Sequence, residues 1–190
     1  RLHSPHLPGR CGLAYLDRTV SQEFLQPLSA LPVPANVLGV LTDIDDTLTT
    51  EGVVPAHVVA AIARLKAAGL KVVPITGRPV GWSVPFASAW PVDAIVAENG
   101  AVALRRNAQG GLDKLYQQSA DERARNFARM QQVLEQIEAT VPGASRATDS
   151  AGRECDIAVD HSEFTQMPQA DIDRCVALMQ AAGMNATVSS

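Results

Sequence analysis

The chain has 190 residues, of which 46% are hydrophobic and 19% charged, and this composition excludes the disordered and collagen-like classes. Its formal net charge of -4, with Lys and Arg scattered, offers no general attraction to nucleic acid or anionic lipid. No apolar run reaches the roughly 20 residues that a membrane helix needs. We therefore expect a cytoplasmic protein with a small partner, without nucleic acid or membrane.

The three cysteines are Cys11, Cys155 and Cys175, and they lie far apart with no CxxC spacing. This arrangement favours neither a disulfide framework nor a thiolate zinc site. We expect three free thiols in a reducing compartment.

Residues 1–35 contain five prolines and do not start with Met. Such sequence is typical of an extension or linker, and a short helix is expected near residues 18–28. An arm bound to the fold is the alternative.

Residues 36–106 alternate between short apolar runs and helical patterns. The expected strands are 36–42, 70–76 and 93–100, and the expected helices are 55–69 and 81–90, the second interrupted by Pro85. This alternation predicts an α/β fold with a Rossmann-like parallel sheet.

After Gly100 the pattern changes. A two-stranded ribbon is expected over 101–106 and 114–118, and a long helix over 120–139. The remaining expected elements are a half-exposed strand within 153–164, a helix over 167–183 and a strand that begins at 185. In the last helix the expected inward residues are Ile172, Cys175, Val176 and Met179.

Three aspartates, Asp43, Asp45 and Asp46, directly follow the first apolar run. If the strand continues, Asp43 and Asp45 leave the same face, and a cation beside them removes their repulsion. Oxygen ligands match Mg²⁺, and the absence of neighbouring His or Cys argues against zinc. One carboxylate beside such a metal can attack phosphorus while the other transfers protons. The alternative is a solvated turn.

The second strand ends with Thr76, Gly77 and Arg78, which offer a hydroxyl, a closely approachable backbone N–H and a positive fork. These are phosphate-binding groups. A simple break between strand and loop, with Arg78 as a surface charge, is the alternative.

The sequence DIDDT, then TGR, then ENGA, each after a strand, resembles the haloacid dehalogenase superfamily. More narrowly it resembles the Cof-type and sugar-phosphate phosphatases, whose α/β cap is inserted after the third core strand. The resemblance implies a core over 36–106 and a cap over 107–190. It implies that Asp43 is the nucleophile and a Mg²⁺ ligand, and that Asp45 is the general acid/base and a ligand through its main-chain carbonyl. Thr76 would bind the phosphoryl group.

The sequence departs from this family at two points. Asp46 stands where many relatives have Gly, and we expect it to hydrogen-bond locally. Relatives also need a lysine and a second acidic, GD-containing motif downstream of the cap. Only Lys66, Lys71 and Lys114 occur, none at the required place, and the chain contains no GD pair. We therefore expect residues 1–190 to be the front part of a longer protein, without the C-terminal half of the core. As such it should bind Mg²⁺ weakly and turn over poorly.

The expected function is Mg²⁺-dependent hydrolysis of a small phosphomonoester, a sugar phosphate, through an aspartyl-phosphate. Candidate substrate contacts are Asn99 and, in the cap, Arg153, Glu154 and Asp160, although alternating charges on a strand also fit a solvated face. The alternatives are a phosphosugar mutase of the same superfamily, a phospho-relay receiver and a non-catalytic binding protein.

Overall fold

The structure is a computed structural model that describes residue 30 and residues 36–188. The chain divides into two units, residues 1–36 and residues 37–190, and every element below belongs to the second. The expected extension over 1–35, with its short helix and Cys11, falls almost wholly outside the described residues.

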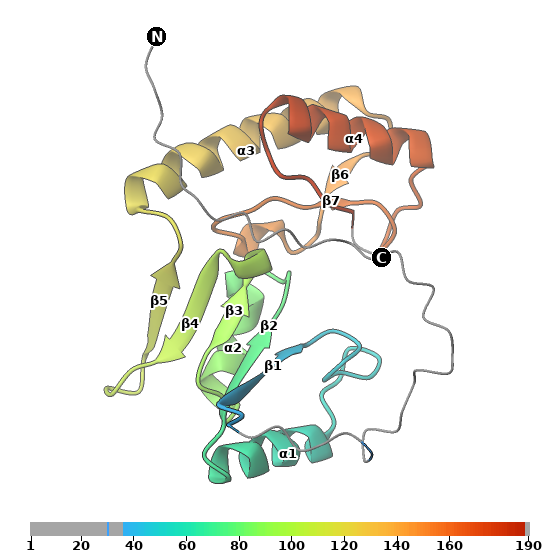
Figure 1. The fold of residues 1–190 in the computed structure, drawn as a ribbon. Coiled ribbons are helices and arrows are strands. Elements are labelled where there is room, and N and C mark those ends of the chain that lie inside the picture. The colour runs from blue at the N-terminus through green and yellow to red at the C-terminus, as the bar shows by residue number, and fades with distance from the viewer. Residues whose placement is uncertain (1–29, 31–35, 189–190) are drawn as a thin grey trace. The chain divides into compact units, whose positions relative to one another are not determined.

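Five strands form one sheet in the order β1-β2-β3-β4-β5 (Figure 1). They are β1 (Gly39–Asp43), β2 (Lys71–Ile75), β3 (Ile95–Ala97), β4 (Val102–Arg106) and β5 (Leu112–Tyr116). The first three run parallel, and β4 and β5 continue the sheet as an antiparallel ribbon. Parallel neighbours need a crossover, and each crossover here contains a helix. The predicted α/β fold class is confirmed.

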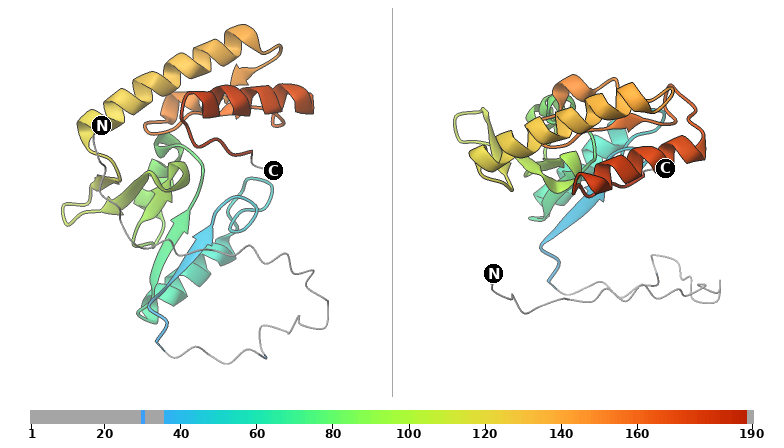
Figure 2. Two further views of the ribbon diagram at one scale, coloured as in Figure 1. Left: turned by 45° about the horizontal axis from the view of Figure 1, so that its top comes forward. Right: turned by 90° about the horizontal axis from the view of Figure 1, so that it is seen from above.

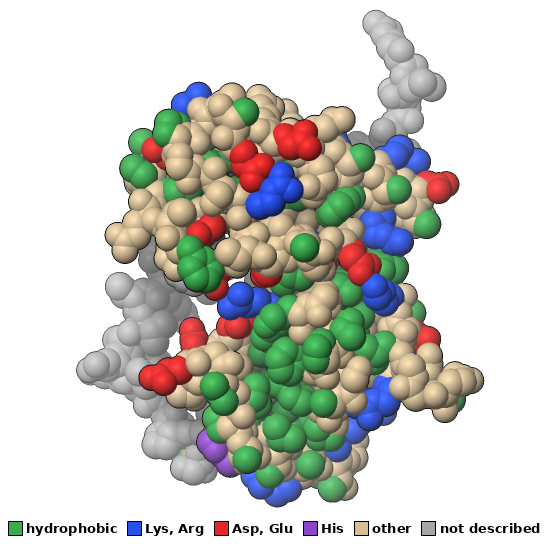
Figure 3. Space-filling model, turned by 180° about the vertical axis from the view of Figure 1, so that it is seen from behind, with side chains coloured by type: hydrophobic (Ala, Val, Ile, Leu, Met, Phe, Trp, Pro, Cys, Tyr) green, Lys and Arg blue, Asp and Glu red, His purple; other side chains and the backbone are tan. Residues whose placement is uncertain are grey.

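The crossover helices are α1 (Ala56–Ala67) and α2 (Val80–Ala89). Side chains alternate between the two faces of a strand, so one face of β2 carries Val72 and Pro74, which are buried. That face and both helices form the first apolar cluster, whose buried members are Ile44, Ile62, Val72, Val80, Ala87, Trp90, Ile95, Ala97, Val102 and Leu104. The opposite face is more open, since Leu41 of β1 is 71% exposed. Figure 3 shows hydrophobic side chains gathered on the half of the molecule that holds the sheet.

The rest of the chain builds a second apolar cluster. Its elements are α3 (Ala120–Thr140), α4 (Gln169–Ala181) and a two-stranded antiparallel sheet of β6 (Ser145–Arg146) and β7 (Val159–Asp160). Helices α3 and α4 lie side by side (Figure 2) and enclose the buried residues Val133, Ile137, Val141 and Cys175. We call residues 120–184 the α3–α4 half and residues 37–116 the sheet half.

The boundary predicted at residues 106 and 107 falls in the loop between β4 and β5. Strand β5 pairs with β4 along its whole length, so the ribbon belongs entirely to the five-stranded sheet. The division into 36–106 and 107–190 stays a prediction.

Three expected elements differ in the structure. Within 153–164 only Val159–Asp160 is a strand, because the N–H groups of residues 154–156 bind a buried carboxylate instead of a neighbouring strand. Residues 185–188 form no strand. Helix α2 runs through Pro85 without interruption, since the burial of Val80 and Ala87 outweighs the local preference.

Of the cysteines in the described part, Cys155 and Cys175 are both free thiols. Among the described residues, no helix is long and apolar enough to cross a membrane.

Candidate active site

Asp43 is the last residue of β1, and it is exposed at the carboxyl end of that strand. It is in register with Ile75, the last residue of β2, so the two strands end side by side. An open depression at this edge is lined by Leu41, Thr42, Asp43, Ile75, Thr76, Gly77 and Asn99. Open α/β sheets bind ligands at the carboxyl ends of their strands. The predicted residues Asp43, Thr76 and Gly77 therefore lie together in a place suited to a ligand.

Asp45 lies near the same edge of the sheet, but not on a continuation of β1 as expected. Strand β1 ends at Asp43 and Ile44 is fully buried, so Asp45 lies in a turn and not on a continuing strand. Its Oδ2 accepts a hydrogen bond from Thr76 Oγ1 at 3.3 Å, and its Oδ1 lies 3.3 Å from Arg78 Nε. The carboxylate is thus oriented by the loop after β2.

Asp46 shapes the turn through its backbone. It has a φ of 55°, in the left-handed region that Asp tolerates better than most residues. Its N–H donates to Thr49 Oγ1 at 2.9 Å, and that hydroxyl donates to the carbonyl of Ile44. The positive φ gives a physical reason why a glycine would also fit here.

Thr76 and Gly77 form a tight loop after β2. Thr76 is buried, and its Oγ1 donates to Asp45 while accepting the N–H of Arg78 at 3.0 Å. A Cβ on Gly77 would lie 3.0 Å from Asn99 Oδ1, closer than real Cβ contacts allow without a shift. Glycine therefore lets the loop pack directly against Asn99.

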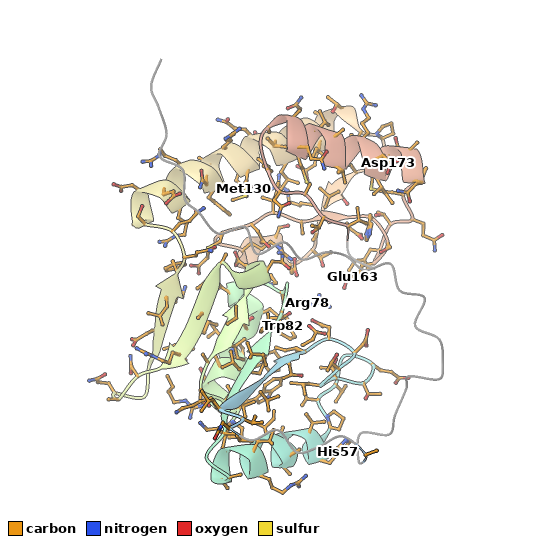
Figure 4. The ribbon with its side chains drawn as sticks, in the orientation of Figure 1. His57, Arg78, Trp82, Met130, Glu163 and Asp173 are labelled. Atoms are coloured by element: carbon orange, nitrogen blue, oxygen red, sulfur yellow. The ribbon has the colours of Figure 1, made fainter. Side chains whose placement is uncertain are left out.

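Arg78 connects the two halves. Its Nη1 lies 3.9 Å from Asp149 Oδ2 and 3.8 Å from Glu163 Oε1, both in the α3–α4 half. Its guanidinium also lies over Trp82 of α2, 5.8 Å from the ring centroid. Figure 4 shows Glu163 approaching Arg78 from the α3–α4 half. In the structure, the partners of Arg78 are carboxylates of the protein, including that of Asp45.

Arg153 is held in a network of ion pairs next to this loop. Its side chain is 8% exposed, and Nε and Nη2 donate to the carboxylate of Asp149. Its Nη1 donates to Asp156 Oδ1 at 2.7 Å and to the carbonyl of Gly77 at 3.3 Å. Asn99 Nδ2 donates to the other oxygen of Asp156 at 3.1 Å. Burial raises the pKa of Asp156, an effect that Arg153 and Asn99 offset in part.

Glu154 and Asp160, the other predicted substrate contacts, bind other parts of the chain. Glu154 accepts from Lys114 Nζ at 2.5 Å and from the hydroxyl of Tyr116. Burial and the Glu154 carboxylate raise the pKa of Tyr116 to about 12. Asp160 accepts the N–H groups of residues 162–165. Burial favours its neutral form, but these N–H donors outweigh burial and lower its pKa.

Glu98 carries a buried carboxylate that the sequence reading did not single out. It is 1% exposed and accepts N–H groups from Val80, Glu154, Cys155 and Asp156. Burial raises its pKa, because the N–H donors compensate only part of the lost hydration. The available signal was a glutamate directly after an apolar strand, in ENGA.

The three lysines of the chain all lie among the described residues and away from Asp43. Lys66 and Lys71 pair with Asp93 at 2.6 and 3.2 Å, and Lys114 pairs with Glu154. That none of them is catalytic stays a prediction.

Within the described part of the chain, no three side chains of His, Cys, Asp or Glu cluster as a metal site. Among the residues that line the depression, Asp43 contributes the carboxylate, and this carboxylate is exposed. Mg²⁺ usually binds through one or two carboxylates, keeps several waters and contacts substrate phosphate. An exposed carboxylate at an open depression is a donor that fits Mg²⁺.

The fold and these strand-end residues define an α/β protein with a polar site at the carboxyl edge of a parallel sheet. Residues 40–132 match the family model of the haloacid dehalogenase-like hydrolases. This match begins in β1 and ends in α3, and it covers just under half of the chain. Among curated proteins, none matches the chain.

Three solved structures illustrate the range of likeness. The Thermoplasma acidophilum protein 0175 has a TM-score of 0.56 and 15% identity, over 75% of this chain and 56% of that one. ATP-bound Plasmodium falciparum IMP-nucleotidase has a TM-score of 0.48 and 12% identity, over 78% and 42%. The Bacteroides thetaiotaomicron phosphatase BT1666 has a TM-score of 0.35 and 21% identity, over 72% and 55%. Only the first likeness is close enough to show a shared fold, and the chain spans just over half of that structure.

Proposed function

We propose that the protein is a Mg²⁺-dependent phosphatase that hydrolyses a small phosphomonoester, a sugar phosphate, through an aspartyl-phosphate on Asp43. One observation carries the proposal. The exposed carboxylate of Asp43 lies in one open depression with Thr76 and Gly77, and Asp45 is hydrogen-bonded to the hydroxyl of Thr76. A nucleophile, a proton carrier and phosphate-binding groups thus meet at one edge.

The reaction follows from these positions in two steps. A carboxylate oxygen of Asp43 forms a bond to phosphorus, and the bond from phosphorus to the sugar oxygen breaks. Protonated Asp45 gives its proton to that leaving oxygen. Asp45, now ionised, takes a proton from water, and the resulting hydroxide attacks phosphorus and releases phosphate and free Asp43.

The residues of this chain would divide the binding work as follows. Asp43 and the carbonyl of Asp45 hold Mg²⁺, which when bound offsets the repulsion between phosphate and carboxylate. The N–H of Gly77 would bind a phosphate oxygen, and the hydroxyl of Thr76 would do so when its hydrogen turns from Asp45 to the phosphate. The contact of Arg78 with Asp45 supports a second role for Arg78, which is to orient the proton carrier.

The α3–α4 half would act as a cap that selects the substrate. Its support is that Asp149 and Glu163 reach Arg78, and that Arg153 donates to the carbonyl of Gly77. A cap in this position would exclude water from the reacting phosphate. We infer a cytoplasmic location as well, which the free thiols of Cys155 and Cys175 support.

The test is a pair of matched variants of the full-length protein, assayed with p-nitrophenyl phosphate and Mg²⁺. Asp43→Asn should lower kcat by at least about a thousandfold, because an amide is a far weaker nucleophile than a carboxylate. Asp46→Asn, the same change three residues further on, should keep kcat within about threefold, because Asp46 acts through its backbone N–H and Asn also tolerates its positive φ. Equal activity of the two variants would exclude Asp43 as the nucleophile.

The products distinguish the phosphatase from a mutase of the same superfamily. Both reactions pass through phosphorylated Asp43, but only hydrolysis releases one free phosphate for each sugar phosphate consumed. A sugar phosphate as the product, with phosphate moved to another hydroxyl, would identify the mutase.

A further inference from the structure

The carboxylate of Glu98 is not used in the proposed reaction, yet it is the most buried ionisable side chain beside the depression. Glu98 follows β3 and directly precedes Asn99, which lines the depression. A buried carboxylate costs free energy unless hydrogen bonds compensate it. The hydrogen-bond partners of Glu98 therefore indicate its role in the structure.

Its first partner is the beginning of α2. Helix α2 starts after Pro79, which makes no side-chain hydrogen bond to the helix. Glu98 Oε1 instead accepts the N–H of Val80 at 3.0 Å. A negative charge at a helix N-terminus also interacts favourably with the helix dipole. Glu98 thus caps α2 from a neighbouring strand end.

Its other partners all lie in the α3–α4 half. The N–H groups of Glu154 and Asp156 approach Glu98 oxygens at 2.9 and 3.2 Å, and that of Cys155 at 2.5 Å. Three consecutive amides around one carboxylate form an anion-binding nest. Here the bound anion is a side chain of the sheet half.

The backbone at this point is strained and held in place. Glu98 and Asn99 have φ values of 50° and 55°, in the left-handed region that is unfavourable for a residue such as Glu and better tolerated by Asn. The Glu98 N–H donates to the carbonyl of Arg78, and the Asn99 N–H to that of Thr76. The Asn99 side chain binds Asp156. Such strain persists only where several contacts determine the conformation.

We propose that Glu98 is a positioning residue whose buried carboxylate anchors residues 154–156 to the start of α2 and thereby fixes Asn99 and the Thr76–Arg78 loop at the depression. The anchor goes beyond the proposed reaction, since it joins the two halves whatever chemistry the depression performs. Arg153, Cys155 and Asp156 are the neighbouring groups whose positions depend on it.

The test is amide hydrogen exchange at residues 154–156 in the purified chain. Glu98→Gln keeps the size of the side chain but replaces one acceptor with an NH₂ donor that faces N–H groups. These amides should exchange at least about tenfold faster, as expected for the loss of a charge-assisted hydrogen bond. Glu98→Asp keeps the charge and should restore part of the protection.

A matched control is Glu138→Gln. Glu138 also accepts a backbone N–H, that of Arg146 at 3.0 Å, but in the α3–α4 half alone. It should speed exchange near residue 146 and leave residues 154–156 unchanged.

The pKa of the Cys155 thiol provides a second readout, which a general loss of stability of the fold would not reproduce. Burial and the charge of Glu98 raise the pKa of Cys155 to about 11. Glu98→Gln should lower this pKa, measured as the pH dependence of alkylation at Cys155 by peptide mass spectrometry, whereas Glu98→Asp should keep it. The proposal is overturned if exchange at 154–156 is the same in Glu98→Gln and the parent protein, or rises equally throughout the chain. Loss of phosphatase activity plays no part in either readout, so the anchor and the proposed function can fail separately.

Discussion

Glu163 and Phe164 are exposed side chains on a loop whose backbone is fixed. Asp160 accepts the N–H groups of both residues, and its own carboxylate is oriented by two further N–H donors of the loop. Phe164 is 70% exposed, and the Glu163 carboxylate lies 3.8 Å from Arg78, which follows the depression residues Thr76 and Gly77. A carboxylate can accept hydrogen bonds from the hydroxyl groups of a sugar, and an aromatic ring can pack on the apolar face of the sugar ring. Glu163 and Phe164 therefore suit a sugar.

We expect Glu163→Gln to raise the KM for a sugar phosphate by about tenfold, since a hydrogen bond to a charged group contributes about 1.5–3 kcal/mol. The KM for p-nitrophenyl phosphate, which offers no hydroxyls, should stay within about twofold. Glu135→Gln, an exposed carboxylate on α3, is the control. A parallel rise in KM for both substrates would point to a general effect on the site instead of recognition of the sugar.

The residues of the depression could be predicted because their signal is local. Asp43, Thr76 and Gly77 each follow an apolar strand directly, and parallel strands bring their carboxyl ends together. Glu98 has the same placement, but its role depends on N–H groups some 56–58 residues away in sequence. The positive φ of Glu98 is likewise held by tertiary contacts. No local sequence pattern could therefore have revealed the role of Glu98.

At the scale of elements, the helices and the longer strands could be predicted from the periodicity of apolar residues and from the Gly and Pro residues that bound them. The predicted helix 120–139 is observed as Ala120–Thr140, with Ser119 accepting the N–H of Glu122 as its N-terminal cap. Most of the strand predicted within 153–164 is absent. Backbone N–H groups of this segment bind the carboxylates of Glu98 and Asp160 instead of a neighbouring strand. Alternation of polar and apolar residues indicates that every second side chain is buried. A loop that packs against the fold can show this pattern as well as a strand can.

Asp93 fixes the start of β2 to the end of α1. Its Oδ2 accepts the N–H of Val72 at 2.8 Å, and its Oδ1 lies 2.6 Å from Lys66 Nζ and 3.2 Å from Lys71 Nζ. Burial favours the neutral carboxyl, but the lysines and the N–H outweigh it and lower the pKa of Asp93. Its contribution to stability is therefore present above the ordinary pKa of 3.8 and is lost as pH falls through the lower pKa of the folded state.

We expect Asp93→Asn to lower the free energy of unfolding at pH 7 by about 1–3 kcal/mol. The difference from the parent protein should shrink as the pH is lowered below the ordinary value of 3.8, because the parent carboxyl then also becomes neutral. Urea unfolding at a series of pH values measures this. A difference that stays constant down to pH values well below 3.8 would show that the charge of Asp93 is not what stabilises the fold.

At the scale of the whole described unit, two apolar clusters are joined by polar contacts. One cluster lies between the sheet and helices α1 and α2, and the other between α3 and α4. The contacts between the halves that we have described are those of Glu98, Asn99, Arg78 and Arg153 with their partners, and those of Glu154 with Lys114 and Tyr116. Composition and periodicity could predict two groups of elements. They could not predict this junction, since the sequence pattern assigned Arg78 to phosphate and Asn99 and Arg153 to the substrate.

This arrangement predicts that the two halves lose stability separately. Ile137 is fully buried in the second cluster, and Ile137→Ala should cost about 2–5 kcal/mol by leaving a cavity there. Native-state hydrogen exchange should then show less protection in α3 and α4, while β2 and β3 keep theirs. Ile95→Ala, an equally buried change in the sheet, should lower protection in β2 and β3. If Ile137→Ala lowers protection equally in both halves, the polar junction couples them into one cooperative unit, and the anchor at Glu98 would be the first contact to remove in a double variant.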